Sequence, residues 1–328
     1  MYKAFFNLTR NPFDIAPDPA LLFPTKRHNE ALASLYYGVR RHKGFVVLTG
    51  EVGTGKTLLV RCLLQLLRQT DVRYAYVFNS TLSPLEFLQY IAADFGLQSV
   101  GKCKSELLLQ LGSFLIECYR KAHTTVLVID EAHHLSTEVL EEVRLLTNLE
   151  TAQSKLLQIL LIGQQELDQK LDSMELRQLK QRIALRCQLG PLDENETRGY
   201  IQRRLQLSRG PAAAAPIFSD DAIARIYRHS RGIPRLINTI CENALITAYA
   251  KQTRLVTPVI VDEVAADFRL NVVSTPSAGI SSIHENRQLL DAVNTLLQFR
   301  EYLKNSQSGE EGLPSAVSLT GRTYEPII

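Results

Sequence analysis

The segment that most constrains the fold is a complete phosphate-binding loop, Gly50-Glu51-Val52-Gly53-Thr54-Gly55-Lys56-Thr57. A short apolar run at 45–48 precedes the loop, and residues 58–67 follow it with apolar side chains at helical spacing. The order of strand, glycine-rich turn and helix distinguishes a working loop from a chance match. A glycine-rich turn without a ligand is the alternative interpretation. The sequence therefore predicts a strand–loop–helix unit around which an α/β domain is built.

The residue types of the loop suit a nucleoside triphosphate. Glycines let the backbone N–H groups of residues 50–57 surround phosphate oxygens, and the helix N-terminus adds the positive end of its dipole. Lys56 is expected to reach the β- and γ-phosphates, and the Thr57 hydroxyl to hold Mg²⁺. Leu58, the next helical residue, completes the predicted binding segment. We therefore expect ATP and Mg²⁺ as cofactors.

Composition indicates a globular protein and excludes several classes. The chain has 328 residues, of which 45% are hydrophobic and 22% charged, and its net charge of +3 gives no argument for nucleic acid or membrane binding. Its 5 cysteines lack any C-x-x-C spacing, which argues against a disulfide framework or a zinc site. No apolar run approaches the roughly 18 residues of a membrane span. These features predict a cytoplasmic protein.

Strand-like and helix-like segments alternate up to about residue 190. The apolar runs at 45–48, 125–129, 156–162 and 185–189 indicate strands, and the segment 72–79 alternates like another strand. This pattern predicts an αβα sandwich on a mostly parallel sheet, the fold of P-loop NTPases. We assign residues 1–190 to this domain, with 1–43 as its lead-in and first helix. Four short helices form a predicted lid at 191–270, and residues 271–328 form a linker, one amphipathic helix at 286–304 and a disordered tail.

An acidic pair, Asp130-Glu131, follows the apolar run 125–129. At the carboxyl end of a buried strand, Asp130 is expected to orient the Mg²⁺ shell and Glu131 to polarise the attacking water. The alternative is a carboxylate pair that caps the next helix. The sequence Asp130-Glu131-Ala132-His133 also matches a motif of one class of helicases. Such a helicase needs a second motor domain, for which the remaining chain is too short. The histidines at 133 and 134 have no partner at metal-ligand spacing.

Taken together, these motifs resemble those of the AAA+ ATPases, and three further stretches resemble the ExeA/GspA group of secretion-pathway ATPases and, more loosely, transposition regulators of the TniB type. The stretches are Tyr2…Phe5-Phe6…Asn11-Pro12-Phe13…Pro17-Asp18-Pro19, Ile162-Gly163-Gln164-Gln165-Glu166-Leu167, and Pro191-Leu192-Asp193…Glu196-Thr197…Tyr200-Ile201…Arg204-Leu205. The resemblance covers about residues 1 to 270.

The resemblance implies roles for several polar residues. Gln164 would be sensor 1, the group that reads the γ-phosphate, with Gln165 as its competitor. Arg235, next to Pro234 at a helix start, would be sensor 2 and reach the nucleotide from the lid; a solvated surface arginine is the alternative. Arg182 would be an arginine finger that acts on the nucleotide of a neighbouring subunit. Arg177 and Arg186 compete for this last role.

The resemblance also implies a base pocket lined by the lead-in, with Phe13, Ile15 and residues 21–23 as candidates or as ordinary core. It implies a homo-oligomer that forms with ATP. Two functions follow: an assembly or regulatory ATPase for a secretion or pilus-like envelope system, or a DNA-associated ATP switch of the TniB type. We favour the first. Larger members of the group carry a membrane span and a periplasmic domain, for which this sequence shows no matching segment, so a membrane-protein partner would dock through the C-terminal region, on residues 286–304.

Overall fold

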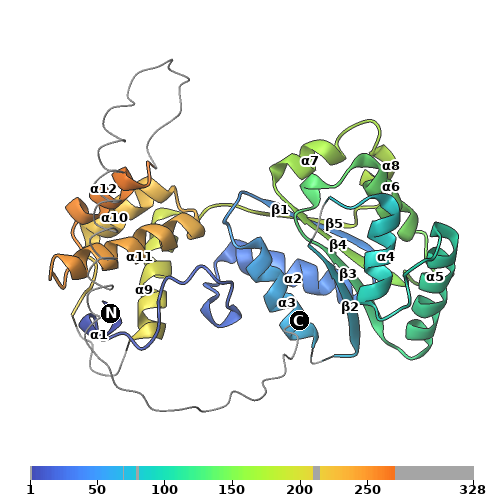
Figure 1. Ribbon diagram of the computed structural model, residues 1–328, viewed down its shortest axis with the longest axis horizontal. Helices are drawn as coiled ribbons and strands as arrows, with labels where there is room; N and C mark the ends of the chain where they lie inside the picture. The colour runs from blue at the N-terminus through green and yellow to red at the C-terminus, as the bar shows by residue number, and fades with distance from the viewer. Residues whose placement is uncertain (1, 69, 79–80, 210–214, 270–328) are drawn as a thin grey trace, which may run out of the picture. The chain divides into compact units, whose positions relative to one another are not determined.

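The computed structural model describes residues 2–68, 70–78, 81–209 and 215–269. The described residues belong to one compact unit, and the predicted helix at 286–304 lies outside them. The described part of the chain contains a parallel sheet with its covering helices and a separate group of helices (Figure 1). No described helix is long and apolar enough to cross a membrane.

Five strands form one entirely parallel sheet in the order β2-β3-β4-β1-β5. Their bounds are β1 Phe45–Gly50, β2 Val72–Val77, β3 Thr124–Ile129, β4 Leu157–Gly163 and β5 Leu185–Leu189. All five fall within a residue or two of the predicted strands. The sheet is thus parallel throughout, where the sequence predicted a mostly parallel one. Because all strands run the same way, their carboxyl ends meet at one edge of the sheet.

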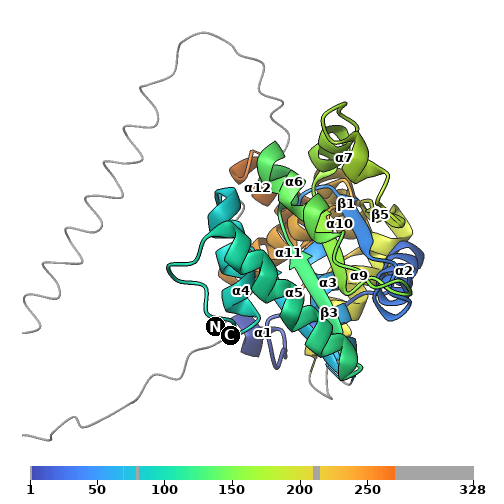
Figure 2. The same cartoon turned by 90° about the vertical axis from the view of Figure 1, so that its right-hand side faces the viewer.

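Alternate residues of each central strand face two different cores. Phe45 and Val47 of β1 pack in a core with the helices α4 Pro84–Asp94, α5 Lys104–Arg120, α6 Thr137–Leu146, α7 Gln165–Leu171 and α8 Arg177–Lys180. Val46 and Leu48 pack with α2 Lys26–Arg40 and α3 Lys56–Leu67 on the opposite face. Figure 2 shows α4, α5 and α6 on one side of β3. Helices on both faces explain why these strands are continuously apolar.

The helices described after residue 191 pack around a common core, in the segment where the sequence predicts a helical lid. They are α9 Glu194–Ser208, α10 Asp220–Ser230, α11 Pro234–Ala250 and α12 Pro258–Asp267. Each start carries a local signal: a capping box at Asp193 and Glu196 for α9, the Ser219 side chain for α10, and proline at the first position of α11 and α12. Local sequence signals thus mark the starts of these helices.

The N-terminal lead-in packs differently from the prediction, which grouped it with the sheet domain. Phe6, Leu8 and Phe13 are buried in the core of the lid helices. The buried Arg204 of α9 donates to the carbonyl oxygens of Pro12 (3.0 Å) and Asp14 (3.2 Å). Proline-rich backbone lacks a regular hydrogen-bonding partner of its own, so its carbonyl groups are satisfied by this side chain. The start of the chain therefore belongs to the lid core as well as to the sheet domain.

Candidate functional site

The phosphate loop has the backbone geometry that its glycines predict. Gly53 and Gly55 have φ angles of 80° and 99°, in the left-handed region that favours glycine. A Cβ atom on Gly53 would lie 2.7 Å from Cβ of Arg235, so the lid backbone approaches the loop closely at this point. The Arg235 N–H donates to the Gly53 carbonyl oxygen at 3.2 Å. The loop therefore contacts both the sheet and the first turn of α11.

Lys56 points back into the loop. Its Nζ donates to the carbonyl oxygens of Gly50 and Glu51, both at 2.8 Å, and the residue is only 7% exposed. Burial lowers the pKa of Lys56, whereas the negative charges of Glu131 and Asp130 act in the opposite direction. The ammonium group thus lies in a cradle of backbone groups at the start of a helix, where phosphate oxygens are favourable partners.

Asp130 and Thr57 face each other at the carboxyl edge of the sheet. The Thr57 hydroxyl donates to Oδ2 of Asp130 at 3.0 Å, and the Tyr76 hydroxyl donates to the same oxygen at 2.7 Å. The backbone N–H of Glu131 donates to Oδ1 at 2.9 Å. A hydroxyl and a carboxylate beside a phosphate cradle are the hard oxygen ligands that Mg²⁺ prefers. The residues present therefore fit the metal predicted from the sequence.

Glu131 adopts an unusual backbone conformation, with φ of 50°, and its side chain is 48% exposed. Its Oε2 lies 3.4 Å from Nδ1 of His133, whose side chain is 7% exposed. Burial lowers the pKa of His133, and the neighbouring His134 acts in the same direction. The neutral ring accepts a hydrogen bond from the Gln164 N–H at 3.4 Å. His133 therefore links the two segments that carry the predicted water-activating and sensing residues, a contact that residue spacing did not reveal.

Most of the predicted site residues line one cavity of about 340 Å³. Its lining includes loop residues 52, 53 and 55–58 together with Glu131, Gln164 and Arg235, and also Tyr200, Arg204 and Asn238 from the lid. Gln165 lines a neighbouring cavity instead. Of the two sensor candidates, Gln164 is thus the one beside the loop. The lid residues Tyr200 and Asn238, joined by a 2.8 Å hydrogen bond, were not singled out from the sequence as site residues.

The candidates for the base pocket divide between core and cavity. Phe13 is 1% exposed and packs edge-to-face on Phe218, with ring centroids 6.0 Å apart. It is therefore a core residue of the lid. Ile15 lines the large cavity, and Leu22 and Phe23 line a smaller one of about 30 Å³ that shares Gly55 with it.

The three arginine-finger candidates lie away from this cavity. All three are exposed, and Arg186 pairs with Asp168 at 3.1 Å. Arg182 precedes β5, at the amino ends of the strands, while the phosphate loop follows the carboxyl end of β1. A strand of five or six residues is about 17–20 Å long. Arg182 is therefore a strand length from the loop of its own chain.

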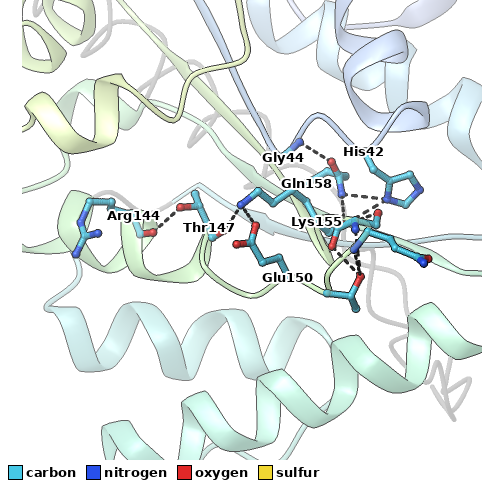
Figure 3. A network of polar contacts seen from close by, with 10 residues as sticks. His42, Gly44, Arg144, Thr147, Glu150, Lys155 and Gln158 are labelled. Carbon is cyan, nitrogen blue, oxygen red and sulfur yellow. Dashed lines mark hydrogen bonds and ion pairs between the residues drawn. The ribbon is translucent and has the colours of Figure 1, made fainter.

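A polar network joins Gly44, before β1, to the turn that precedes β4 (Figure 3). The buried side chain of Gln158 accepts from the Gly44 N–H at 2.8 Å and donates to the Lys155 carbonyl oxygen at 2.9 Å. Lys155 in turn donates to the Thr147 carbonyl oxygen at 3.1 Å and pairs with Glu150. The pKa of Glu150 is lowered mainly by Lys155, with a smaller effect of Arg182. This network fixes the turn at 150–155 beside the amino end of β4.

His28 supports the phosphate loop from α2 and was not recognised from the sequence. Its ring contacts the Thr25 hydroxyl through Nδ1 at 2.7 Å and the Thr54 carbonyl oxygen through Nε2 at 3.3 Å. Only the ring tautomer with a proton on Nε2 satisfies Thr54, since a carbonyl oxygen accepts. This contact joins the start of α2 to the phosphate loop at Thr54. A histidine at a helix start carries no motif that would have identified it.

We expect protonation of His28 to destabilise the folded protein. Burial lowers its pKa below the usual value of about 6.5, so the unfolded chain binds a proton at a pH where the folded chain does not. The contribution of neutral His28 is complete above about pH 6.5 and is lost as the pH falls toward the folded-state pKa. Unfolding midpoints measured from pH 7.5 to 5.5 should therefore fall more steeply for the natural protein than for His28→Gln, which keeps an N–H donor. Parallel curves would show that His28 does not titrate differently in the two states.

Comparison with known proteins agrees with this geometry. The AAA domain family (AAA_22) matches residues 39–171. General secretion pathway protein A of Aeromonas hydrophila is 46% identical over 252 residues, which cover 76% of this chain and 45% of that protein. This chain thus spans about half the length of the curated relative.

Two solved structures share the fold at low identity. The ORC2 protein of Aeropyrum pernix, solved as ADPNP-ADP complexes, matches with a TM-score of 0.60 and 18% identity over 81% of this chain and 75% of that chain. The ORC1 protein of Aeropyrum pernix in complex with DNA matches with a TM-score of 0.62 and 18% identity over 80% and 70%. Identities this low show a common fold and nothing about the target.

Proposed function

Because the chain belongs to the AAA+ ATPases of the ExeA/GspA-like group, we propose that it hydrolyses ATP with Mg²⁺ and that the ATP cycle assembles or regulates a secretion or pilus-like envelope system. One observation carries the enzymatic part. Lys56, Thr57, Glu131, Gln164 and Arg235, which come from four distant segments, all line one cavity. Acidic, amide and basic groups around one phosphate cradle are what phosphoryl transfer requires.

The proposal gives a role to the loop residues, to the acidic pair and to Gln164. Lys56 and the N–H groups of the loop bind the phosphates, and Thr57 and Asp130 hold Mg²⁺. When bound, Mg²⁺ would neutralise charge on the phosphate oxygens. Glu131 accepts a proton from the attacking water, and the Gln164 amide orients that water and reads the γ-phosphate.

In this proposal Arg235 couples the lid to the bound nucleotide. This residue is exposed, lies on the first turn of α11 and lines the same cavity. Its guanidinium would contact the γ-phosphate, and its backbone N–H already bonds to the loop at Gly53. Hydrolysis would remove this contact and thereby change how the lid packs on the loop.

Coupling between subunits is proposed to depend on Arg182. The residue is a strand length from its own loop, so it would act only on the nucleotide of a neighbouring subunit. Arg186 is already paired with Asp168, which favours Arg182 over this competitor. The proposal therefore requires a homo-oligomer that forms with ATP.

The envelope role rests on the relative that is named as a General secretion pathway protein. This chain covers 45% of that protein, so the role of the whole relative comes to this chain only as a proposal. A membrane-protein partner would bind C-terminal to the lid, where the sequence places an amphipathic helix at 286–304. The protein would then act at the cytoplasmic side of the membrane through this partner.

The test is the oligomeric state of the Glu131→Gln variant, measured by size-exclusion chromatography with light scattering, with and without Mg-ATP and a short DNA duplex. We expect a larger assembly with Mg-ATP that is the same with and without DNA. The matched control carries Lys56→Ala in addition, so that the lysine contact to the phosphates is lost, and should stay unassembled.

Assembly that requires DNA, and that weakens steeply as salt increases, would instead favour the DNA-associated switch. A protein that stays a monomer under all four conditions would contradict the subunit coupling proposed here. Release of phosphate from Mg-ATP by the natural protein, measured in parallel, tests the ATPase itself independently of assembly.

A further inference from the structure

Tyr76 is a partly buried strand residue that contacts the candidate metal site. It lies on β2, the edge strand next to β3, and its side chain lies on the sheet face covered by α3. Its hydroxyl donates to Oδ2 of Asp130 at 2.7 Å, the same oxygen to which Thr57 donates. Tyrosine in an alternating strand segment normally signals core packing, so the sequence gives no reason to assign it to the site.

The three donors around Asp130 fix its carboxylate in one orientation. Thr57 and Tyr76 hold Oδ2, and the Glu131 N–H holds Oδ1 at 2.9 Å. Asp130 itself is 6% exposed, so water has little access to replace a missing donor. Of these contacts only the Tyr76 hydroxyl comes from outside the phosphate-loop and acidic-pair segments.

The position of Tyr76 is itself fixed by backbone contacts. Tyr76 pairs with Val128 in the β2–β3 ladder, and its N–H donates to Oδ2 of Asp94 at 2.6 Å. The hydroxyl is thus held at the end of β2 where it meets the Asp130 carboxylate, and a tyrosine O–H is a hydrogen-bond donor.

We propose that Tyr76 is a positioning residue for the Mg²⁺ site: its hydroxyl holds the Asp130 carboxylate in the orientation that the metal requires. Partners that orient a metal ligand contribute about 10–100-fold to metal affinity or activity in other proteins. The inference rests on the proposed function, since it assumes that Mg²⁺ binds with the nucleotide at Thr57 and Asp130. It adds a contribution from β2 to a site otherwise formed by the loop and the end of β3.

The test compares Tyr76→Phe with the natural protein by the affinity for a fluorescent ATP analogue, measured in EDTA and over a Mg²⁺ titration. We expect equal affinities in EDTA. Mg²⁺ should increase the affinity for the analogue, and the titration gives the Mg²⁺ concentration at which half of this increase is reached. We expect this concentration to be about 10–100-fold higher in the variant. The matched control is Tyr74→Phe, two residues earlier on the same strand and face. The Tyr74 hydroxyl forms no hydrogen bond to any residue that the structure describes, so this variant should behave like the natural protein.

The inference would be overturned if Tyr76→Phe reached half of its metal-dependent gain in affinity at the same Mg²⁺ concentration as the natural protein, or at a lower one. A general loss of folding would lower the affinity in EDTA as well, and Tyr74→Phe shows what loss of a hydroxyl from this strand does by itself. If Mg²⁺ does not increase the affinity of the natural protein for the ATP analogue, the result contradicts the proposed Mg-dependent ATPase itself. The failures of the two proposals are therefore distinguishable.

Discussion

Replacing Glu131 with glutamine is expected to slow ATP hydrolysis by about 10²- to 10⁴-fold, the usual contribution of a general base, while ATP still binds. Glutamine keeps the size of the side chain but cannot accept the proton of the attacking water. Lys56, Thr57 and the loop N–H groups are unchanged, so the affinity for ATP should stay within a few-fold. The measurements are single-turnover hydrolysis of ATP and equilibrium binding of a fluorescent analogue.

The control for this prediction is Glu166→Gln. Glu166 lies in the first turn of helix α7 and lines the neighbouring cavity, close enough for its charge to influence Lys56. Its replacement removes a negative charge from the same region without removing the proposed base. Equal losses of rate in the two variants would mean that the charge of the region, and not proton transfer at Glu131, supports hydrolysis.

Replacing Arg182 with alanine is expected to reduce hydrolysis in the assembled state by about 10³- to 10⁵-fold, the range seen for arginine fingers. The physical reason is the loss of a positive charge that reaches the neighbouring subunit's γ-phosphate in the transition state. Arg186→Ala, which removes a residue already paired with Asp168, is the matched control and should have a much smaller effect. The measurement is the steady-state rate at protein concentrations where the oligomer forms.

Mixing two inactive variants tests whether Arg182 acts between subunits. An Arg182→Ala subunit keeps Glu131, and a Glu131→Gln subunit keeps Arg182, so a mixed interface contains one complete site. We expect activity to return when the two variants are combined. If the mixture stays inactive although mixed oligomers form, Arg182 does not complete the site of a neighbour, and Arg177 becomes the candidate to test.

Local sequence was sufficient for the elements whose signals are local. The loop glycines need left-handed φ angles, and both Gly53 and Gly55 have them. Continuous apolar runs predicted central strands because helices cover both faces of the sheet, and the capping box at Asp193 and Glu196 marked the start of α9. Short helices such as α8 Arg177–Lys180, which lack a capping hydrogen bond from a side chain, were not predicted.

The contacts between site residues join segments that lie far apart in the sequence, and local sequence patterns do not predict such contacts. Asp130 and Thr57 are separated by 73 positions and Tyr76 and Asp130 by 54, yet both pairs meet because parallel strands bring their carboxyl ends to one edge. Hydrophobic periodicity assigns a residue to a face of a strand, but the partner on that face depends on strand order. Residue type and spacing alone thus predict the phosphate loop and the acidic pair as site residues. The burial of Phe13 in the lid and the contacts of His28, His133 and Tyr76 arise only when the folded chain packs distant segments together.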